Sequence, residues 1–161
     1  MEKVIKAIKE IQKNRPTIYV GRGEFREFTI ELNPSLDIEK IKTIASKNNF
    51  ILPKDYMEFL SFSNGIHFYE YSDHQFYPLE ESIAYNKEDD RIEKRYLNIA
   101  TCLEDDIYMK CDGSYLNMYI SEEGISDLRP LNMTFEAFME CGLISGFAYF
   151  WLWGQSEDGL Y

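Results

Sequence analysis

The chain has 161 residues, a length typical of one compact domain. Apolar residues make up 45% and aromatic residues 16%, so a hydrophobic core can form, and disorder through low hydropathy is excluded. The 17 Lys and Arg residues against 28 Asp and Glu residues give a net charge of −11. Because this charge repels phosphate backbones and anionic lipids, we expect direct binding neither to nucleic acid nor to a membrane surface.

The negative charge is concentrated in the second part of the chain. Residues 1–60 contain 11 Lys and Arg against 9 Asp and Glu, whereas residues 61–161 contain 6 against 19, a net charge of −13. The acidic residues of this second part form short runs between apolar segments, where loops or helix ends are expected. We therefore expect them on one region of the surface. The runs are Glu80-Glu81, Glu88-Asp89-Asp90, Glu104-Asp105-Asp106 and Glu122-Glu123.

Cellular location is indicated by the N-terminus, the apolar segments and the cysteines. The first 14 residues carry a charge at every second or third position, which is typical of neither a signal peptide nor a membrane span. The longest apolar stretch, Leu143 to Trp153, has 11 residues, against the roughly 20 that cross a bilayer. It predicts core packing, with a partner pocket as the alternative. Cys102, Cys111 and Cys141 fit neither a disulfide framework nor a metal motif, so we expect reduced, mostly buried thiols in the cytoplasm.

The first elements predicted along the chain are a helix and a hairpin. Val4, Ile8 and Ile11 recur at helical spacing with lysines on the other face, which predicts an amphipathic helix. Residues 17–20 and 28–32, separated by a Gly-x-Gly turn, predict two extended segments that pair as a hairpin.

Two further helices are predicted before the strands begin. The first has an apolar stripe from Ile38 and ends at Asn48-Asn49, because asparagine tolerates the left-handed conformation. In the second, Pro53 suits the first helical position and Gly65 is a left-handed stop. Its predicted buried face consists of Tyr56, Phe59 and Leu60.

From Ile66 onwards the apolar period changes to two, which predicts strands. Residues 78–86 predict a short helix and residues 87–94 an exposed charged segment. Thr134 opens a last helix, with Gly142 as its stop. The whole pattern predicts a single α+β domain over residues 1–161, with helices packed on a mostly antiparallel, meander-like sheet. The strands are predicted at 96–102, 107–111, 115–120 and 125–128, with tight turns at Asp112-Gly113 and Glu123-Gly124.

Residues that could carry out catalysis or hold a cofactor give little signal. His67 and His74 have no further ligand at a metal-binding spacing, and Gly21-Arg22-Gly23 lacks the rest of a dinucleotide or phosphate loop. We therefore expect no metal and no cofactor. The acidic runs leave three alternatives open: a solvated surface, a pair of catalytic carboxylates, or a surface complementary to a basic partner.

One segment resembles a known family. The pattern Leu52-Pro53-x-Asp55-Tyr56-x-x-Phe59-Leu60, followed by Ser63-Asn64-Gly65, closely resembles the motif of the SUKH superfamily, which includes fungal cell-wall assembly regulators and many bacterial toxin-immunity proteins. The final Thr134-Phe135-Glu136-Ala137-Phe138 also resembles the last helix of that family, so the resemblance spans residues 35–142. It departs from the family where Glu104-Asp105-Asp106 replaces a glycine-rich strand region. The matching residues Leu52, Pro53, Tyr56, Phe59, Asn64 and Gly65 imply a structural role only.

The resemblance implies a non-enzymatic protein that acts by binding. The most direct expectation is an immunity protein that occludes a cognate protein toxin, a nuclease or a deaminase, whose basic cleft meets the acidic half of this chain. A regulatory scaffold without a toxin partner is the second interpretation. A small carboxylate-dependent hydrolase is the third, and it requires two carboxylates converging in an apolar cleft. The expected partner-binding residues are Glu88, Asp89, Asp90, Glu104, Asp105 and Asp106.

Overall fold

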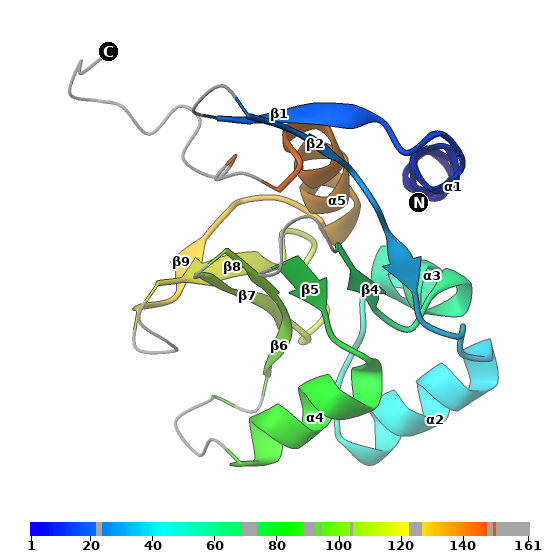
Figure 1. Cartoon of the computed structure of the whole chain (residues 1–161). Coiled ribbons are helices and arrows are strands. Elements are labelled where there is room, and N and C mark those ends of the chain that lie inside the picture. The colour runs from blue at the N-terminus through cyan, green and yellow to red at the C-terminus, as the bar shows by residue number, and fades with distance from the viewer. Residues whose placement is uncertain are drawn as a thin grey trace.

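The computed structural model describes residues 1–21, 24–68, 74–88, 93, 95–103, 105–122, 127–147 and 150, with the side chains of 18–21, 24 and 26 left aside. Within these residues it confirms the predicted α+β fold: helices pack around a seven-stranded antiparallel sheet, and a two-stranded sheet stands apart (Figure 1). None of the described helices is long and apolar enough to cross a membrane.

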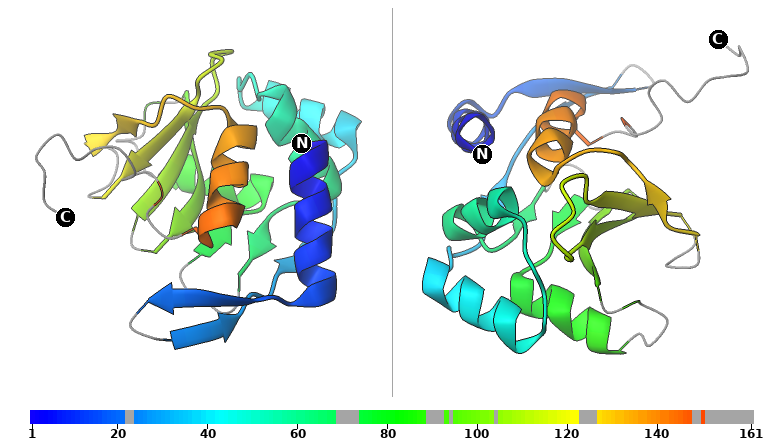
Figure 2. Two further views of the ribbon diagram at one scale, coloured as in Figure 1. Left: turned by 90° about the horizontal axis from the view of Figure 1, so that it is seen from above. Right: turned by 180° about the vertical axis from the view of Figure 1, so that it is seen from behind.

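The large sheet is a meander in which every strand pairs with its neighbour in the chain. Its order is β3-β4-β5-β6-β7-β8-β9, and all six pairings are antiparallel. Figure 2 shows α1 and α5 lying side by side. The helices are α1 (Glu2–Asn14), α2 (Ile38–Lys47), α3 (Lys54–Phe62), α4 (Leu79–Glu88) and α5 (Phe135–Ser145). The strands are β1 (Thr17–Gly21), β2 (Glu24–Glu27), β3 (Glu31–Leu32), β4 (Ile66–His67), β5 (His74–Phe76), β6 (Tyr96–Cys102), β7 (Asp105–Lys110), β8 (Met118–Ser121) and β9 (Arg129–Pro130).

The predicted hairpin exists, but its second strand was placed wrongly. The partner of β1 is β2, at residues 24–27, and residues 28–32 lead into the large sheet instead. The reason is burial: Phe28 and Ile30 enter the core, where the ring of Phe28 stacks on Phe68 at a centroid distance of 5.6 Å. Pairing in the exposed hairpin would leave these two side chains in water.

The helix that carries the resemblance motif buries the predicted face, since Tyr56, Phe59 and Leu60 are at most 1% exposed. Pro53 is the residue before the first helical turn rather than within it, with φ −62° and ψ 148°. Gly65 has the predicted positive φ of 103°, but the helix ends earlier, at Phe62. A Cβ on Gly65 would lie 2.6 Å from the carbonyl oxygen of Phe76, so the glycine permits a close backbone crossing.

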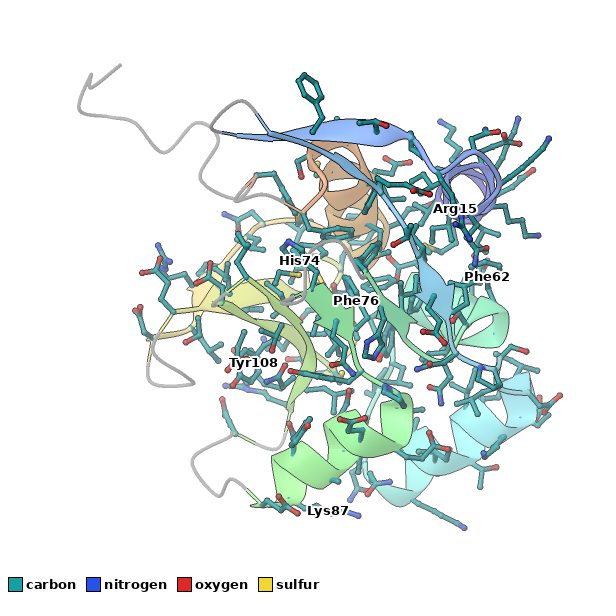
Figure 3. All side chains as sticks on the ribbon, in the orientation of Figure 1. Arg15, Phe62, His74, Phe76, Lys87 and Tyr108 are labelled. Carbon is teal, nitrogen blue, oxygen red and sulfur yellow. The ribbon has the colours of Figure 1, made fainter. Side chains whose placement is uncertain are left out.

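The core is largely aromatic, and Phe76, labelled in Figure 3, lies at its centre. Its ring meets those of Phe59, Phe68, Phe135, Phe138 and Phe147 at centroid distances of 5.5 to 6.3 Å. Phe147 and Phe150 are buried, which confirms core packing for this part of the C-terminal apolar stretch. Residues 151–153 lie outside the described residues.

The last helix begins as predicted but does not end at Gly142. The Thr134 side chain accepts a hydrogen bond from the Ala137 N–H, and the helix continues to Ser145, with Gly146 in the left-handed conformation after it. Gly142 is an interior residue. A Cβ there would lie 2.0 Å from the ring of Phe147, so the missing side chain makes room for that ring.

Three smaller predictions for the strands also change. The strand predicted from residue 107 begins at Asp105, and the one predicted from residue 115 begins at Met118, because Tyr115 is 81% exposed and cannot pack. Residues 125 and 126 of the strand predicted at 125–128, and the turn at 123–124, lie outside the described residues. Residues 127 and 128 are not in a strand, and β9 follows at 129–130. Cys102 and Cys111 are buried as predicted, and Cys141 is partly exposed.

Candidate protein-binding site

One face of α4 carries two carboxylates and a tyrosine. Glu81, Tyr85 and Glu88 are four and three residues apart, a spacing that places them in one row along a helix. The Tyr85 hydroxyl donates a hydrogen bond to Glu81 Oε1 at 2.9 Å, and Tyr85 is 41% exposed. The row therefore presents an aromatic ring between two acidic groups.

The position of this helix is set by a residue of the resemblance motif. The Asn64 side-chain oxygen accepts a hydrogen bond from the Leu79 N–H at 2.8 Å, which satisfies a donor at the start of α4. Its amide nitrogen donates to Glu80 Oε2 at 3.1 Å, and the Lys40 ammonium lies 3.2 Å from Glu80 Oε1. Asn64 is recognisable in the sequence as part of the motif, but no local pattern predicts this role in positioning α4.

The sheet continues the row through Tyr77, which follows β5. The rings of Tyr77 and Tyr85 meet edge to face, with centroids 5.2 Å apart and an interplanar angle of 68°. The Tyr77 hydroxyl hydrogen-bonds to Thr101 Oγ1, and Thr101 donates to Asp106 Oδ1 at 3.2 Å. Thr101 and Asp106 are direct partners between β6 and β7. We call this set the tyrosine–carboxylate strip: Tyr77, Glu81, Tyr85, Glu88, Thr101 and Asp106.

The electrostatics of the strip keep its phenols protonated. Burial raises the pKa of Tyr77 above its ordinary value, with Asp106 and Glu81 adding to the effect. The hydrogen bond to Glu81 raises the pKa of Tyr85, again with smaller contributions from burial and nearby acids. Within the described part of the chain, Glu81, Glu88 and Asp106 have no ion-pair partner, in contrast to the neighbouring Glu80. The part of the strip that the structure describes is therefore a negative surface whose carboxylates form no ion pair with a described cation, and it contains aromatic rings.

The structure places the six expected partner-binding residues differently from one another. Glu88 and Asp106 belong to the strip, which contains residues of two different acidic runs, 18 positions apart in the sequence. Asp105 is only 5% exposed and pairs across the strands with the buried Cys102, so the expectation of an exposed loop residue is wrong for it. The cause is strand alternation, because successive residues of β7 point to opposite faces. Asp89, Asp90 and Glu104 lie outside the described residues.

A second group of carboxylates bears on the hydrolase alternative. Asp55, Glu58 and Glu136 line a groove of about 540 Å³ between the N-terminal ends of α3 and α5. Burial raises the pKa of Asp55, but each of its oxygens accepts a backbone N–H at 2.9 Å, one from Tyr56 and one from Glu136. Asp55 therefore links the starts of two helices. Held by these donors, it is poorly placed to act as a general acid.

A row of potentially reactive side chains lies in the sheet interior. His74, Cys102 and Asp105 stand in register on β5, β6 and β7. Burial raises the pKa of the Cys102 thiol well above its usual range, so it is not a thiolate nucleophile. His74 accepts the Leu103 N–H on Nδ1 at 3.1 Å, which gives this buried ring a structural contact. Among the described residues, no three His, Cys, Asp or Glu side chains are grouped so that they could hold a metal ion.

Comparison with known proteins agrees with the resemblance seen in the motif. The model of the SMI1/KNR4 family (SUKH-1) matches residues 35–141, from just before α2 into α5. The chain is also 26% identical over 171 residues to YobM, an uncharacterized protein of Bacillus subtilis (strain 168), with 95% of this chain and 91% of that protein covered. The chain belongs to the SMI1/KNR4 family.

Proposed function

We propose that this SUKH-1 protein acts by binding and not by catalysis, as an immunity protein that neutralises a cognate toxin in the cytoplasm. The observation that carries the proposal is the tyrosine–carboxylate strip, where three carboxylates without ion-pair partners in the described structure surround exposed aromatic surface. The family supports the same role, because SUKH proteins include many toxin-immunity proteins. Toxins of the nuclease and deaminase classes bind nucleic acid through basic clefts, which an acidic surface complements.

The strip combines the two ingredients of a strong protein interface. Its carboxylates accelerate the encounter with a basic partner and disfavour acidic competitors. Its tyrosines supply large, rigid contact area of the kind that dominates binding energy. Asp89, Asp90 and Glu104 remain partner-binding residues in this proposal, because in the sequence they adjoin Glu88 or β7.

The test is charge reversal in the full chain, with the protein encoded beside this one as the candidate toxin. Glu88→Lys and Asp106→Lys should each slow association with that toxin and reduce the protection of growing cells. Glu140→Lys, an exposed residue of α5 away from α4, changes the net charge equally and serves as the control (Figure 1). It should leave the association rate of the toxin unchanged.

Salt gives an independent measure on the unmodified protein. Raising the ionic strength should slow association, because the screening length falls from about 10 Å at 0.1 M to about 3 Å at 1 M salt. Melting temperatures of Glu88→Lys and Glu140→Lys should match the parent, since exposed charges contribute roughly ±0.5 kcal/mol to stability. Asp106→Lys removes the acceptor of the Thr101 hydrogen bond at a half-buried position, so its melting temperature is measured first and its association rate is compared at a temperature where it is folded. Toxin binding with on-rates independent of salt and of both reversals would contradict the proposal.

A further inference from the structure

We infer that the tyrosine–carboxylate strip recognises an arginine side chain of the partner protein, with the guanidinium stacked on the ring of Tyr85 and hydrogen-bonded to Glu81. The inference rests on the proposed binding function and specifies its chemistry. On a basic partner surface, the strip would thus select arginine over lysine. Three features of the strip support arginine: an aromatic ring held in place, a carboxylate with an acceptor position that no described residue occupies, and a second carboxylate close by.

The ring of Tyr85 is exposed but held. Its hydroxyl donates to Glu81 four residues earlier, and its ring meets the ring of Tyr77 edge to face. Two contacts on different elements thus fix the orientation of a side chain that remains 41% exposed. A ring that is already ordered loses little conformational entropy when a ligand stacks on it.

Glu81 has the acceptor capacity that a guanidinium needs. The hydrogen bond from Tyr85 uses Oε1, and within the described residues neither Oε1 nor Oε2 has a Lys or Arg partner. A planar guanidinium can donate N–H groups to a carboxylate at its edge while its face lies on an aromatic ring. An ammonium group is more strongly hydrated and lacks the flat face, so the same site favours arginine over lysine.

Asp106 adds a second negative charge from the sheet side of the strip. Thr101 fixes one of its oxygens, and Tyr77 hydrogen-bonds to Thr101 in turn. Asp106 reaches Tyr77 through Thr101, and Glu81 reaches it through Tyr85, so both carboxylates lie near the Tyr77 side chain. Charge complementarity therefore selects a cation, and the same carboxylates repel phosphate groups and acidic peptides.

The experiment uses the full chain and two blocked tripeptides, acetyl-Gly-Arg-Gly-amide and acetyl-Gly-Lys-Gly-amide, in an NMR titration of backbone amides. We expect shifts concentrated at the strip, with the arginine peptide binding at least about threefold more tightly than the lysine peptide. Glu81→Gln should weaken the arginine peptide about tenfold, the equivalent of one charge-assisted hydrogen bond. Tyr85→Leu should remove the preference for arginine.

Two control variants make the same kinds of substitution at exposed positions outside the strip. Glu140→Gln removes one exposed carboxylate of α5, and Tyr115→Leu removes an 81% exposed ring from the loop before β8. Both should bind the arginine peptide within about twofold of the parent. Circular dichroism melts of all four variants establish that each is folded.

The inference is overturned if both peptides bind equally, if shifts spread evenly over the acidic surface, or if Glu81→Gln behaves like Glu140→Gln. It is also overturned if no shifts occur up to about 200 mM peptide, a range that covers the Kd of tens of millimolar expected for a single-side-chain contact. Failure of the proposed function is a separate result. A Glu81→Gln variant that loses the arginine peptide but still neutralises the toxin would overturn the arginine inference and leave the immunity role standing.

Discussion

Replacing Gly142 with alanine tests how the C-terminal helix meets the core. Gly142 lies inside α5, where alanine is normally better than glycine by about 1 kcal/mol. In this fold the added Cβ would lie 2.0 Å from one ring carbon of Phe147 and 2.4 Å from another. Such distances are far inside van der Waals contact, so the alanine and the ring cannot occupy their places together.

The cost follows from what confines the ring. Phe147 is fully buried, with Phe68 at a centroid distance of 4.8 Å, Phe76 at 5.5 Å and Phe138 at 6.2 Å. Because these neighbours leave it no space to retreat, it must leave the core, which costs about as much as deleting it, about 3–5 kcal/mol. After subtracting the helical gain of about 1 kcal/mol, Gly142→Ala should destabilise the protein by about 2–4 kcal/mol.

A double-mutant cycle followed by urea denaturation measures this. In a Phe147→Ala background the obstacle is absent, so Gly142→Ala should stabilise the protein by about 1 kcal/mol instead. The change of sign between the two backgrounds is the expected result. A Gly142→Ala variant as stable as the parent, or one with the same loss in both backgrounds, would refute the reasoning.

Four further predictions follow from burial and charge. Phe59→Ala should cost about 3–5 kcal/mol in urea denaturation, because its ring is buried among the core aromatics. Gly65→Ala should cost at least about 2 kcal/mol by the same assay, since a side chain would meet the β5 backbone at a φ of 103°. Asp105→Lys should lower the melting temperature sharply, because it places an unpaired charge in the core, whereas Asp106→Lys, at a half-buried position with one hydrogen bond to lose, should lower it much less. Asp112 has a pKa lowered to about 2 from 3.8 by hydrogen bonds from Ser114 and Lys110, so ionised Asp112 stabilises the fold above pH 4. The stability deficit of Asp112→Asn should therefore shrink as the pH falls from 4 towards 2.

Local features of the fold could be predicted from the sequence, and contacts between distant segments could not. The buried face of α3 and the Thr134 cap depend on residues within one or two turns, so spacing alone reveals them. The apolar helix pattern before Gly142 predicts a stop there, whereas the glycine in fact makes room for the ring of Phe147. The place of that ring is set by Phe68 and Phe76, which are far from it in the sequence. The position of the second hairpin strand could not be predicted for the same reason, since the burial of Phe28 depends on Phe68, 40 positions away in the sequence.

The proposed binding surface likewise combines features that the local sequence predicts with contacts that only the fold creates. The row of Glu81, Tyr85 and Glu88 can be read from helical spacing, but its importance depends on Tyr77 and Asp106, which the sheet brings to it. A run of acidic residues in the sequence predicts the same exposure for each of its members. In a strand, however, successive side chains point to opposite faces, so Asp105 points inward and Asp106 outward. The proposed binding surface is therefore a row across three elements and not a run along the chain, and reversing a whole run would confuse loss of binding with loss of the fold.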